Sequence, residues 1–351
     1  MKTIKVKMVG FWDGMDFHKD IRVCPLFWAM DKHYDVQFCD DPDYIICSTM
    51  EEFYEYCEYP QIRILYSAEN YIADFNLIDY CISPYPVSFL DRHFCLPACF
   101  SIRDRALAVS QKSRNYSMVF LKEKPYFANF ITGHPTESRI RERFFEALSQ
   151  YKRIESPGRY LNNRDNAENF LYFDEQKTDF QRKSKFTLCF ESTYHDGFIT
   201  EKILDAFYAD TIPVYYGSSF VNTIFNENAF INVANYPDFD AAINAIQKLD
   251  QNDDLYLEML RQPVFKNENI VAETYRGLEE FVCNIFDQPP EKAYRRSLEY
   301  LPKCHNQYIT KLRKAKPFVE DPQNYILQTY TGRELLRLAL ARMNKRFRKK
   351  Q

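Results

Sequence analysis

The sequence predicts an α/β protein with two doubly wound, mainly parallel sheets that face each other across a cleft. Short apolar runs rich in β-branched and aromatic residues alternate with helical patterns along most of the 351 residues. A more polar and basic stretch, 98–116, divides these runs into two sets. The length suits two domains, and a hydrophobic content of 46% is enough to build a large core.

The first set predicts an N-terminal domain over residues 1–112. Its strands are the apolar runs at 3–11, 36–39, 44–48, 62–67 and 77–83. Helical patterns at 21–34 and 51–57 lie between strands. Strands that alternate with helices indicate a parallel sheet with crossover connections.

The second set predicts a C-terminal domain over residues 113–288. Its strands are expected at 127–132, 185–190, 212–216 and 229–233. Its helices are expected at 137–151, 200–209, 238–249, 252–261 and 269–286. In the first of these helices the apolar positions 140, 144, 145 and 148 share one face, as in an amphipathic helix.

Composition excludes several classes of protein. A net charge of −3 argues against a general nucleic-acid binder, which needs a broad positive surface. No glycine-rich phosphate-binding loop occurs. The ten cysteines form no C-x-x-C pair and are expected to be free thiols in a reducing compartment. The first residues alternate like a strand rather than a signal peptide, and no run of about 20 apolar residues occurs, so we expect a cytoplasmic protein.

The tail, within residues 289–351, has a different character. Eight Lys or Arg residues and one Glu follow Thr331. Four apolar positions share one helical stripe: Leu336, Leu340, Met343 and Phe347. A basic amphipathic helix is typical of peripheral contact with an anionic membrane, and a solvated terminal helix is the alternative.

The segment ESTYHDGFITEKILDAF, residues 191–207, follows a predicted strand and begins a helix near Thr200. Ligands bind beyond the carboxyl ends of strands in such sheets, and helix N-termini attract anions. Lys202 lies in the first turn, where the helix dipole disfavours a cation by roughly 0.3–1 kcal/mol. Either Lys202 binds a phosphate, or it pairs with Asp205 three residues on. Glu201 either accepts hydrogen bonds from sugar hydroxyls or complements the helix dipole.

The longer stretch CFESTYHDGFITEKILDAFYADTIPVYYGS, residues 189–218, resembles the donor-binding motif of the α1,3/4-fucosyltransferases, glycosyltransferase family 10. The following segment, FNENAFINVANYPDFDAAINAI, is similar to the family's next segment. The match is close over about 185–250 and scattered from about 62 to 285. The tail agrees with bacterial members only in character.

The resemblance implies a GT-B architecture of two Rossmann-like domains with GDP-fucose as donor. It implies that Lys202 holds the diphosphate and that Glu201 contacts the ribose or fucose. Arg141, in RERFFEAL, matches an arginine that pairs with the phosphates, and Arg159, in SPGRYLNN, matches a segment near the nucleotide.

The same resemblance places Glu191, Ser192, Phe198 and Thr200 in the donor-binding set. Two of them depart from the family pattern, which usually has Asn at position 192 and often Tyr at position 198. Serine can still hydrogen-bond a phosphate oxygen, whereas phenylalanine cannot. The resemblance therefore predicts one donor contact fewer at Phe198 and a lower donor affinity.

A base for the acceptor hydroxyl is expected from the first domain. LYSAENYIADFNLIDYCIS, residues 65–83, resembles the family's G-E-N segment and places Glu69 just after a predicted strand. The resemblance assigns Glu69 the role of catalytic base; a helix-start carboxylate is the alternative. The DPD at 41–43 suits a turn, so we expect neither an obligatory metal nor another cofactor.

The function that follows is inverting transfer of L-fucose from GDP-fucose to the 3-OH or 4-OH of N-acetylglucosamine. The acceptor would be an oligosaccharide with galactose and N-acetylglucosamine, and the product would resemble a Lewis antigen of lipopolysaccharide. A transferase that uses another nucleotide sugar is one alternative. A non-catalytic module that binds a nucleotide or glycan is the other, although the presence of both a base and a cationic site disfavours it.

Overall fold

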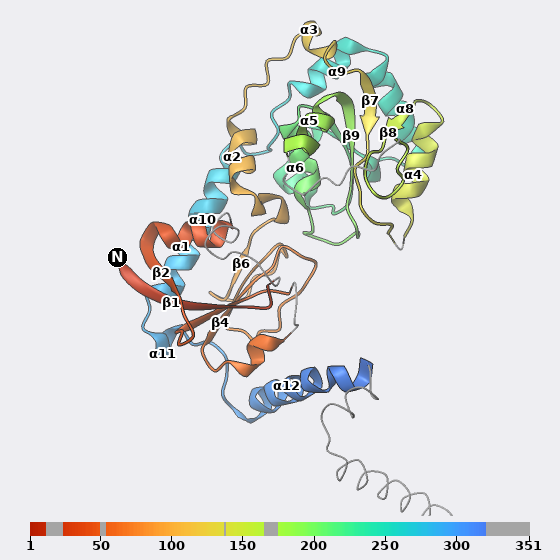
Figure 1. Cartoon of the computed structure of the whole chain (residues 1–351). Coiled ribbons are helices and arrows are strands. Elements are labelled where there is room, and N and C mark those ends of the chain that lie inside the picture. Colours follow the sequence, from red (N-terminus) through yellow and green to blue (C-terminus); the bar gives the residue numbers. More distant parts are fainter. Residues whose placement is uncertain (12–23, 50–53, 137, 165–174, 321–351) are drawn as a thin grey trace, which may run out of the picture.

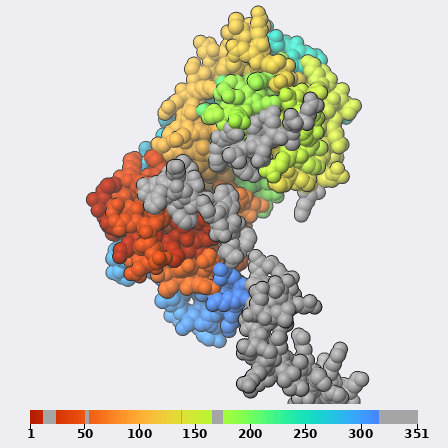
Figure 2. Space-filling model, viewed as in Figure 1, coloured from red at the N-terminus to blue at the C-terminus, as the bar shows by residue number. Residues whose placement is uncertain are grey.

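The computed structural model describes residues 1–11, 24–49, 54–136, 138–164 and 175–320. It contains two parallel sheets, each with helices packed on it, which Figure 1 shows one above the other. The predicted α/β fold with two doubly wound domains is therefore confirmed. In the space-filling view, the red to orange surface of the first domain meets the yellow to green surface of the second (Figure 2).

The first sheet has six strands, and every adjacent pair is parallel. In spatial order they are β2 (Tyr34–Phe38), β1 (Lys2–Val9), β3 (Tyr44–Cys47), β4 (Ile62–Tyr66), β5 (Tyr80–Ser83) and β6 (His93–Cys95). The direction of winding reverses between β1 and β3. All residues of β3, β4 and β5 are buried, as expected for central strands of a sheet covered on both faces.

The second sheet has five strands, also parallel throughout. In spatial order they are β11 (Ile231–Asn232), β10 (Ile212–Tyr216), β9 (Ser184–Phe190), β7 (Tyr126–Asn129) and β8 (Ile154–Glu155). The winding reverses between β7 and β9. In an open α/β sheet, the crevice beyond the carboxyl ends at such a switch point is where ligands bind.

Helices cover both faces of the second sheet. One face carries α5 (Glu175–Arg182) and α6 (Glu201–Tyr208). The other carries α4 (Ile140–Ser149), α8 (Phe239–Asp250) and α9 (Asp253–Leu260), whose apolar side chains join Phe186 and Phe190 in one core. Helices α8 and α9 begin as predicted because the side chains of Asp238 and Asn252 cap their N-termini.

Helix α10 (Ile270–Phe286) is the last helix of the range 113–288, yet it packs against the first domain. It lies alongside α1 (Pro25–His33) and near α2 (Arg103–Gln111), as Figure 1 shows. The ring of Phe286 lies 4.8 Å from that of Tyr44. Lys32 and Glu279 form an ion pair at 2.7 Å. The core of the first domain is thus completed by a segment that follows the second.

Several local predictions differ from the structure. The stretch 98–116, predicted only as a polar boundary, contains the helix α2 (Arg103–Gln111). In the predicted helix 51–57, the described part forms a 3₁₀ turn at Glu55–Glu58. Helix α5 and the short strands β6 and β8 were not predicted. Three other short helices are α3 (Met118–Leu121), α7 (Val221–Ile224) and α11 (Pro290–Ala293).

Helix α12 (Tyr300–Glu320) follows and rests on the first domain. Asn306 accepts a hydrogen bond from Arg63 at 2.8 Å, and Arg313 pairs with Glu58 at 2.7 Å. Among the described residues no helix is long and apolar enough to span a membrane. The predicted basic amphipathic helix after Thr331 lies outside the described residues.

Candidate active site

The segment from Glu191 to Ile199 leaves the carboxyl end of β9, as predicted, and that end lies at the switch point of the second sheet. Gly217, which follows β10, lies directly beside it. A Cβ atom at Gly217 would come within 2.6 Å of Glu191 Cγ and 2.4 Å of the Tyr215 hydroxyl. Only glycine therefore lets the two strand ends approach each other this closely.

Glu191 is buried and binds the start of α6. Its Oε1 accepts the backbone N–H of Thr200 at 2.8 Å, and its Oε2 accepts the Thr200 hydroxyl at 2.7 Å. Burial raises the pKa of Glu191 above its ordinary value, against the opposing charge of Lys202. The carboxylate therefore fixes the N-terminus of α6 from the end of the neighbouring strand.

Lys202 points back over the helix N-terminus rather than along the helix. Its Nζ donates to Thr200 Oγ1 at 2.8 Å and lies 3.3 Å from Glu201 Oε1 and 3.5 Å from Glu191 Oε2. Burial alone would lower the pKa of Lys202, but the two carboxylates outweigh it and raise the pKa above its ordinary value. Lys202 is therefore a firmly charged ammonium at the carboxyl edge of the sheet.

The alternative in which Lys202 pairs with Asp205 does not describe this helix. Asp205 is fully buried and instead binds Lys177 of α5 at 2.7 Å and Arg105 of α2. Burial would raise the pKa of Glu201, but Lys202 and Lys177 outweigh it and lower that pKa to about 2. Glu201 is therefore an acceptor of hydrogen bonds throughout the physiological pH range.

Arg141 reaches the same place from α4. Its guanidinium donates to the carbonyl oxygen of Phe190 at 2.8 and 3.1 Å and to Thr132 Oγ1 at 3.2 Å. Phe190 and Thr132 lie at and just beyond the carboxyl ends of β9 and β7. The charge of Arg141 also opposes the rise in the pKa of Lys202, so the two cations are in electrostatic reach of each other.

The remaining predicted donor residues lie around this centre. Arg159 is exposed, and the preceding Gly158 is so close to Thr132 that a Cβ there would meet its carbonyl oxygen at 2.5 Å. Arg159 therefore lies on the loop after β8, at the same edge of the sheet. Ser192 is exposed at the start of the motif loop, which comprises residues 191–199, whereas Phe198 is buried.

The bend of the motif loop rests on the first domain. Gly197 has a φ of +81°, and a Cβ there would come within 2.4 Å of Pro86 Cδ. This position needs glycine because of both its left-handed backbone and the close approach. Next to it, the Cys99 N–H donates to the Ile199 carbonyl at 2.7 Å, and the Tyr85 hydroxyl lies 3.3 Å from His195 Nδ1.

Glu69 follows β4 at the carboxyl edge of the first sheet, as predicted, and it is exposed. Its N–H donates to Ser67 Oγ at 3.2 Å, and its carbonyl accepts the N–H of Tyr71 at 2.8 Å. The neighbouring Asn70 accepts a hydrogen bond from Tyr85. The loop of Glu69 is thus joined through Tyr85 to the motif loop of the second domain.

Sequence reasoning did not identify Arg105, Thr132, Lys177 or Tyr85. Three of them act through contacts between elements far apart in the chain, which no local spacing reveals. Thr132 alone carried a signal, because it is the last residue of the predicted strand 127–132. Among the described residues no three His, Cys, Asp or Glu side chains are grouped as a metal ion would require.

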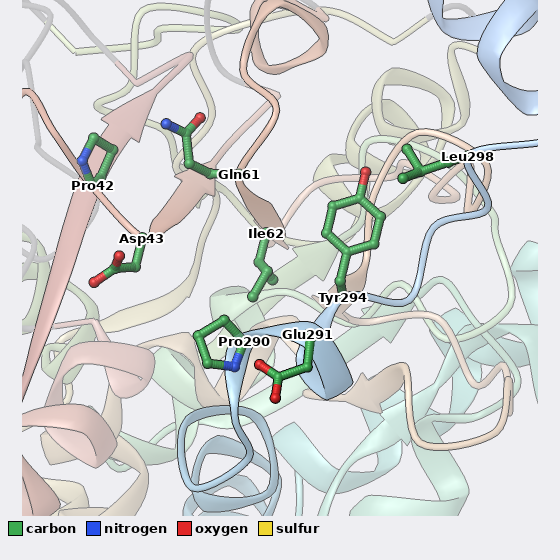
Figure 3. Close-up of a pocket in the computed structure, with 8 residues that line it drawn as sticks. All are labelled: Pro42, Asp43, Gln61, Ile62, Pro290, Glu291, Tyr294 and Leu298. Carbon is green, nitrogen blue, oxygen red and sulfur yellow. The ribbon is translucent and has the colours of Figure 1, made fainter.

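A surface pocket of about 490 Å³ lies elsewhere, near the amino ends of β3 and β4. Apolar side chains of Ile62, Pro290, Tyr294 and Leu298 line much of it (Figure 3). It lies at the edge of the first sheet opposite to Glu69. It therefore takes no part in the site described above.

Two parallel-sheet domains, with a cationic helix N-terminus at the switch point of the second, are the arrangement expected of a GT-B type glycosyltransferase. A sequence profile described as glycosyltransferase family 10 (fucosyltransferase), C-terminal part, matches residues 121–303. A second profile, for the N-terminal domain of the α-(1,3)-fucosyltransferase FucT, matches residues 6–101. The chain belongs to glycosyltransferase family 10.

Individual relatives agree with this assignment. The chain is 28% identical to the α-(1,3)-fucosyltransferase FucT of Helicobacter pylori over 309 residues, which are 78% of this chain and 63% of that protein. It is 26% identical over 163 residues, 45% of this chain and 27% of the other, to a putative fucosyltransferase, R654, of Acanthamoeba polyphaga mimivirus. The matches thus span less than two thirds of the length of these relatives.

Solved structures share the fold. A crystal structure of an α1,3-fucosyltransferase superposes with a TM-score of 0.65 at 24% identity, covering 80% of this chain and 90% of that one. An α1,3-fucosyltransferase with GDP gives a TM-score of 0.62 at 25% identity, covering 80% and 91%. These likenesses confirm the expected GT-B type arrangement of the two domains.

Proposed function

We propose that this protein is an inverting fucosyltransferase that uses GDP-fucose. The acceptor is the 3-OH or 4-OH of N-acetylglucosamine in a glycan that also contains galactose, and the product resembles a Lewis antigen. Membership of family 10 supports the proposal that fucose is the sugar transferred. The names of the solved relatives, one with GDP-fucose and one with GDP, support the donor.

The arrangement around Lys202 carries the donor part of the proposal. Lys202 and Arg141 bring two cations to the switch point of the second sheet, beside the N-terminus of α6. The first N–H groups of a helix have no carbonyl partner within the helix and attract anions. A diphosphate at this edge would meet all three, and Glu201 would accept hydrogen bonds from a sugar hydroxyl.

The proposed reaction is a single displacement. Glu69 takes the proton of the acceptor hydroxyl, and the oxygen of that hydroxyl attacks the anomeric carbon of fucose. The bond between that carbon and the phosphate oxygen breaks, and GDP leaves with the electron pair. Lys202 and Arg141 stabilise the charge that develops on the diphosphate, which is the role of preorganised electrostatics in enzymes. That this chemistry needs no metal remains a prediction.

Incubation with labelled GDP-fucose and a panel of galactose-containing acceptors tests the proposal. The expected result is a fucosylated product, and linkage analysis then distinguishes the 3-OH from the 4-OH. Competition among GDP, UDP and CMP tests the choice of nucleotide, with GDP expected to compete best. Purified protein that binds GDP yet transfers no fucose to any acceptor would instead support a non-catalytic binding module.

A further inference from the structure

Tyr85 occupies a position between the two halves of the proposed active site. It follows β5 in the first domain and is buried. Its hydroxyl donates to Asn70 Oδ1, next to Glu69, and lies 3.3 Å from His195 Nδ1 in the motif loop of the second domain. One side chain thus contacts both the loop of the proposed base and the loop that leads to the phosphate site.

The hydroxyl of Tyr85 can take part in two hydrogen bonds, once as donor and once as acceptor. A tyrosine hydroxyl has one hydrogen, which Tyr85 donates to Asn70. The contact with His195 Nδ1, at 3.3 Å, is a hydrogen bond in the tautomer that carries the proton on Nδ1. The rings of Tyr85 and His195 also meet edge to face, with centroids 5.3 Å apart and an interplanar angle of 80°.

The segment that carries Tyr85 is also in close contact with the motif loop. A Cβ atom at Gly197 would lie 2.8 Å from the carbonyl oxygen of Pro84 and 2.4 Å from Pro86 Cδ. The N–H of Gly197 in turn donates to Ser218 Oγ at 2.9 Å. The motif loop is therefore in contact with the Tyr85 segment through close packing as well as hydrogen bonds.

We propose that Tyr85 is a positioning residue that fixes the position of the Glu69 loop relative to the motif loop. When the donor site is occupied, this contact places the base correctly. This inference rests on the proposed function and adds a residue that acts through Asn70 and His195 without touching the reacting atoms. A base displaced by about 1 Å can cost on the order of 100-fold in rate. Tyr85 should consequently affect kcat and leave donor binding nearly unchanged.

The test uses the full-length protein and the variant Tyr85→Phe, which loses only the hydroxyl. Tyr80→Phe is the matched control, because the Tyr80 hydroxyl is buried in the same domain and has no hydrogen-bond partner among the described residues. Asn70→Ala removes the acceptor of the same hydrogen bond, and Asn70 is exposed. Each variant is assayed for GDP affinity, for kcat and donor KM, and for amide exchange of residues 67–75 with and without GDP.

In the wild type, GDP should slow amide exchange in residues 67–75. Tyr85→Phe and Asn70→Ala should lose most of this protection and lower kcat about 10- to 100-fold, with GDP affinity and donor KM within about twofold. Tyr80→Phe should behave like the wild type. A merely structural defect would change kcat and donor KM together and would not lower kcat alone.

Two results would overturn this inference without affecting the proposed function. One is full protection of residues 67–75 and normal kcat in Tyr85→Phe. The other is a loss of GDP affinity in proportion to kcat, which would make Tyr85 part of the donor site. A wild type that binds GDP but transfers no fucose would overturn the proposed function, while the exchange measurement would still decide the coupling. A wild type that binds no GDP would overturn both.

Discussion

Thr200 donates two hydrogen bonds to one carboxylate, from its N–H to Glu191 Oε1 and from its hydroxyl to Glu191 Oε2. Both oxygens of Glu191 are thereby engaged at the start of α6. The resemblance placed Glu191 among the donor-binding residues. Its contacts support an indirect role instead, in which it holds the helix whose first turn carries Lys202.

Glu191→Gln should destabilise the protein, because the amide NH₂ would face one of the two Thr200 donors. Leaving a buried donor unpaired costs about 1–3 kcal/mol. Urea unfolding measures this, with Glu227→Gln as control since Glu227 is exposed. Equal stability of Glu191→Gln and the wild type would show that these two hydrogen bonds do not hold the helix.

Lys202→Ala and Arg141→Ala should each weaken GDP binding more than tenfold and slow transfer. A hydrogen bond to a charged group contributes roughly 1.5–3 kcal/mol, and each variant removes at least one. Calorimetry with GDP measures the effect. Lys122→Ala, at an exposed lysine, is the matched control. Unchanged GDP affinity in both site variants would remove the phosphate assignment.

Glu69→Gln should keep the fold and GDP affinity within about threefold but lose roughly 10²–10⁴-fold in transfer rate, the usual contribution of a general base. Glutamine has the same shape but cannot accept the proton. The acidic limb of the wild-type pH–rate profile should disappear in the variant. Retention of more than about a tenth of the turnover would mean that another group is the base.

Acid should weaken the fold partly through Glu201. Its pKa is lowered to about 2 in the folded protein from an ordinary value of 4.5, so its ionised form stabilises the fold above pH 4.5. This contribution is lost as the pH falls from 4.5 towards 2. Unfolding free energies at pH 7 and pH 3 should therefore differ less for Glu201→Gln than for the wild type. An identical difference would contradict the shift.

Ending the chain near Thr331 should leave transfer to soluble acceptors intact and reduce binding to anionic vesicles. The basic amphipathic pattern of residues 332–351 is the reason, since such helices bind anionic surfaces. Co-sedimentation with vesicles at low salt compares the two proteins. Equal binding of the full-length and shortened chains would locate any membrane contact elsewhere.

The sequence predicted which residues lie together at the N-terminus of α6 because they are close together in the chain. Glu191, Thr200, Glu201 and Lys202 lie within twelve positions between one strand and one helix, so local patterns suffice to bring them together. The donor-binding roles of Glu191 and Thr200 came from the resemblance, and Arg141 was found only through it. Its burial between α4 and the end of β9 depends on how two distant elements pack, which periodicity does not reveal.

Other features lacked any local signal. Strands β6 and β8 have three and two residues, too few to show an alternating pattern. Arg105 and Lys177 lie in polar segments without a local sign of burial, yet both are buried against Asp205. The periodicity of residues 269–286 predicted a helix correctly but could not show which domain its apolar face would join.

The return of α10 to the first domain has a consequence for how the protein is made. The last strand of the first sheet ends at Cys95, but the helix that covers Tyr34 and Tyr44 ends at Phe286. At about 5–20 residues per second, a ribosome needs on the order of ten to forty seconds to synthesise the chain between them. During that interval the nascent first domain exposes apolar surface, so it completes its folding only after the second domain has been translated.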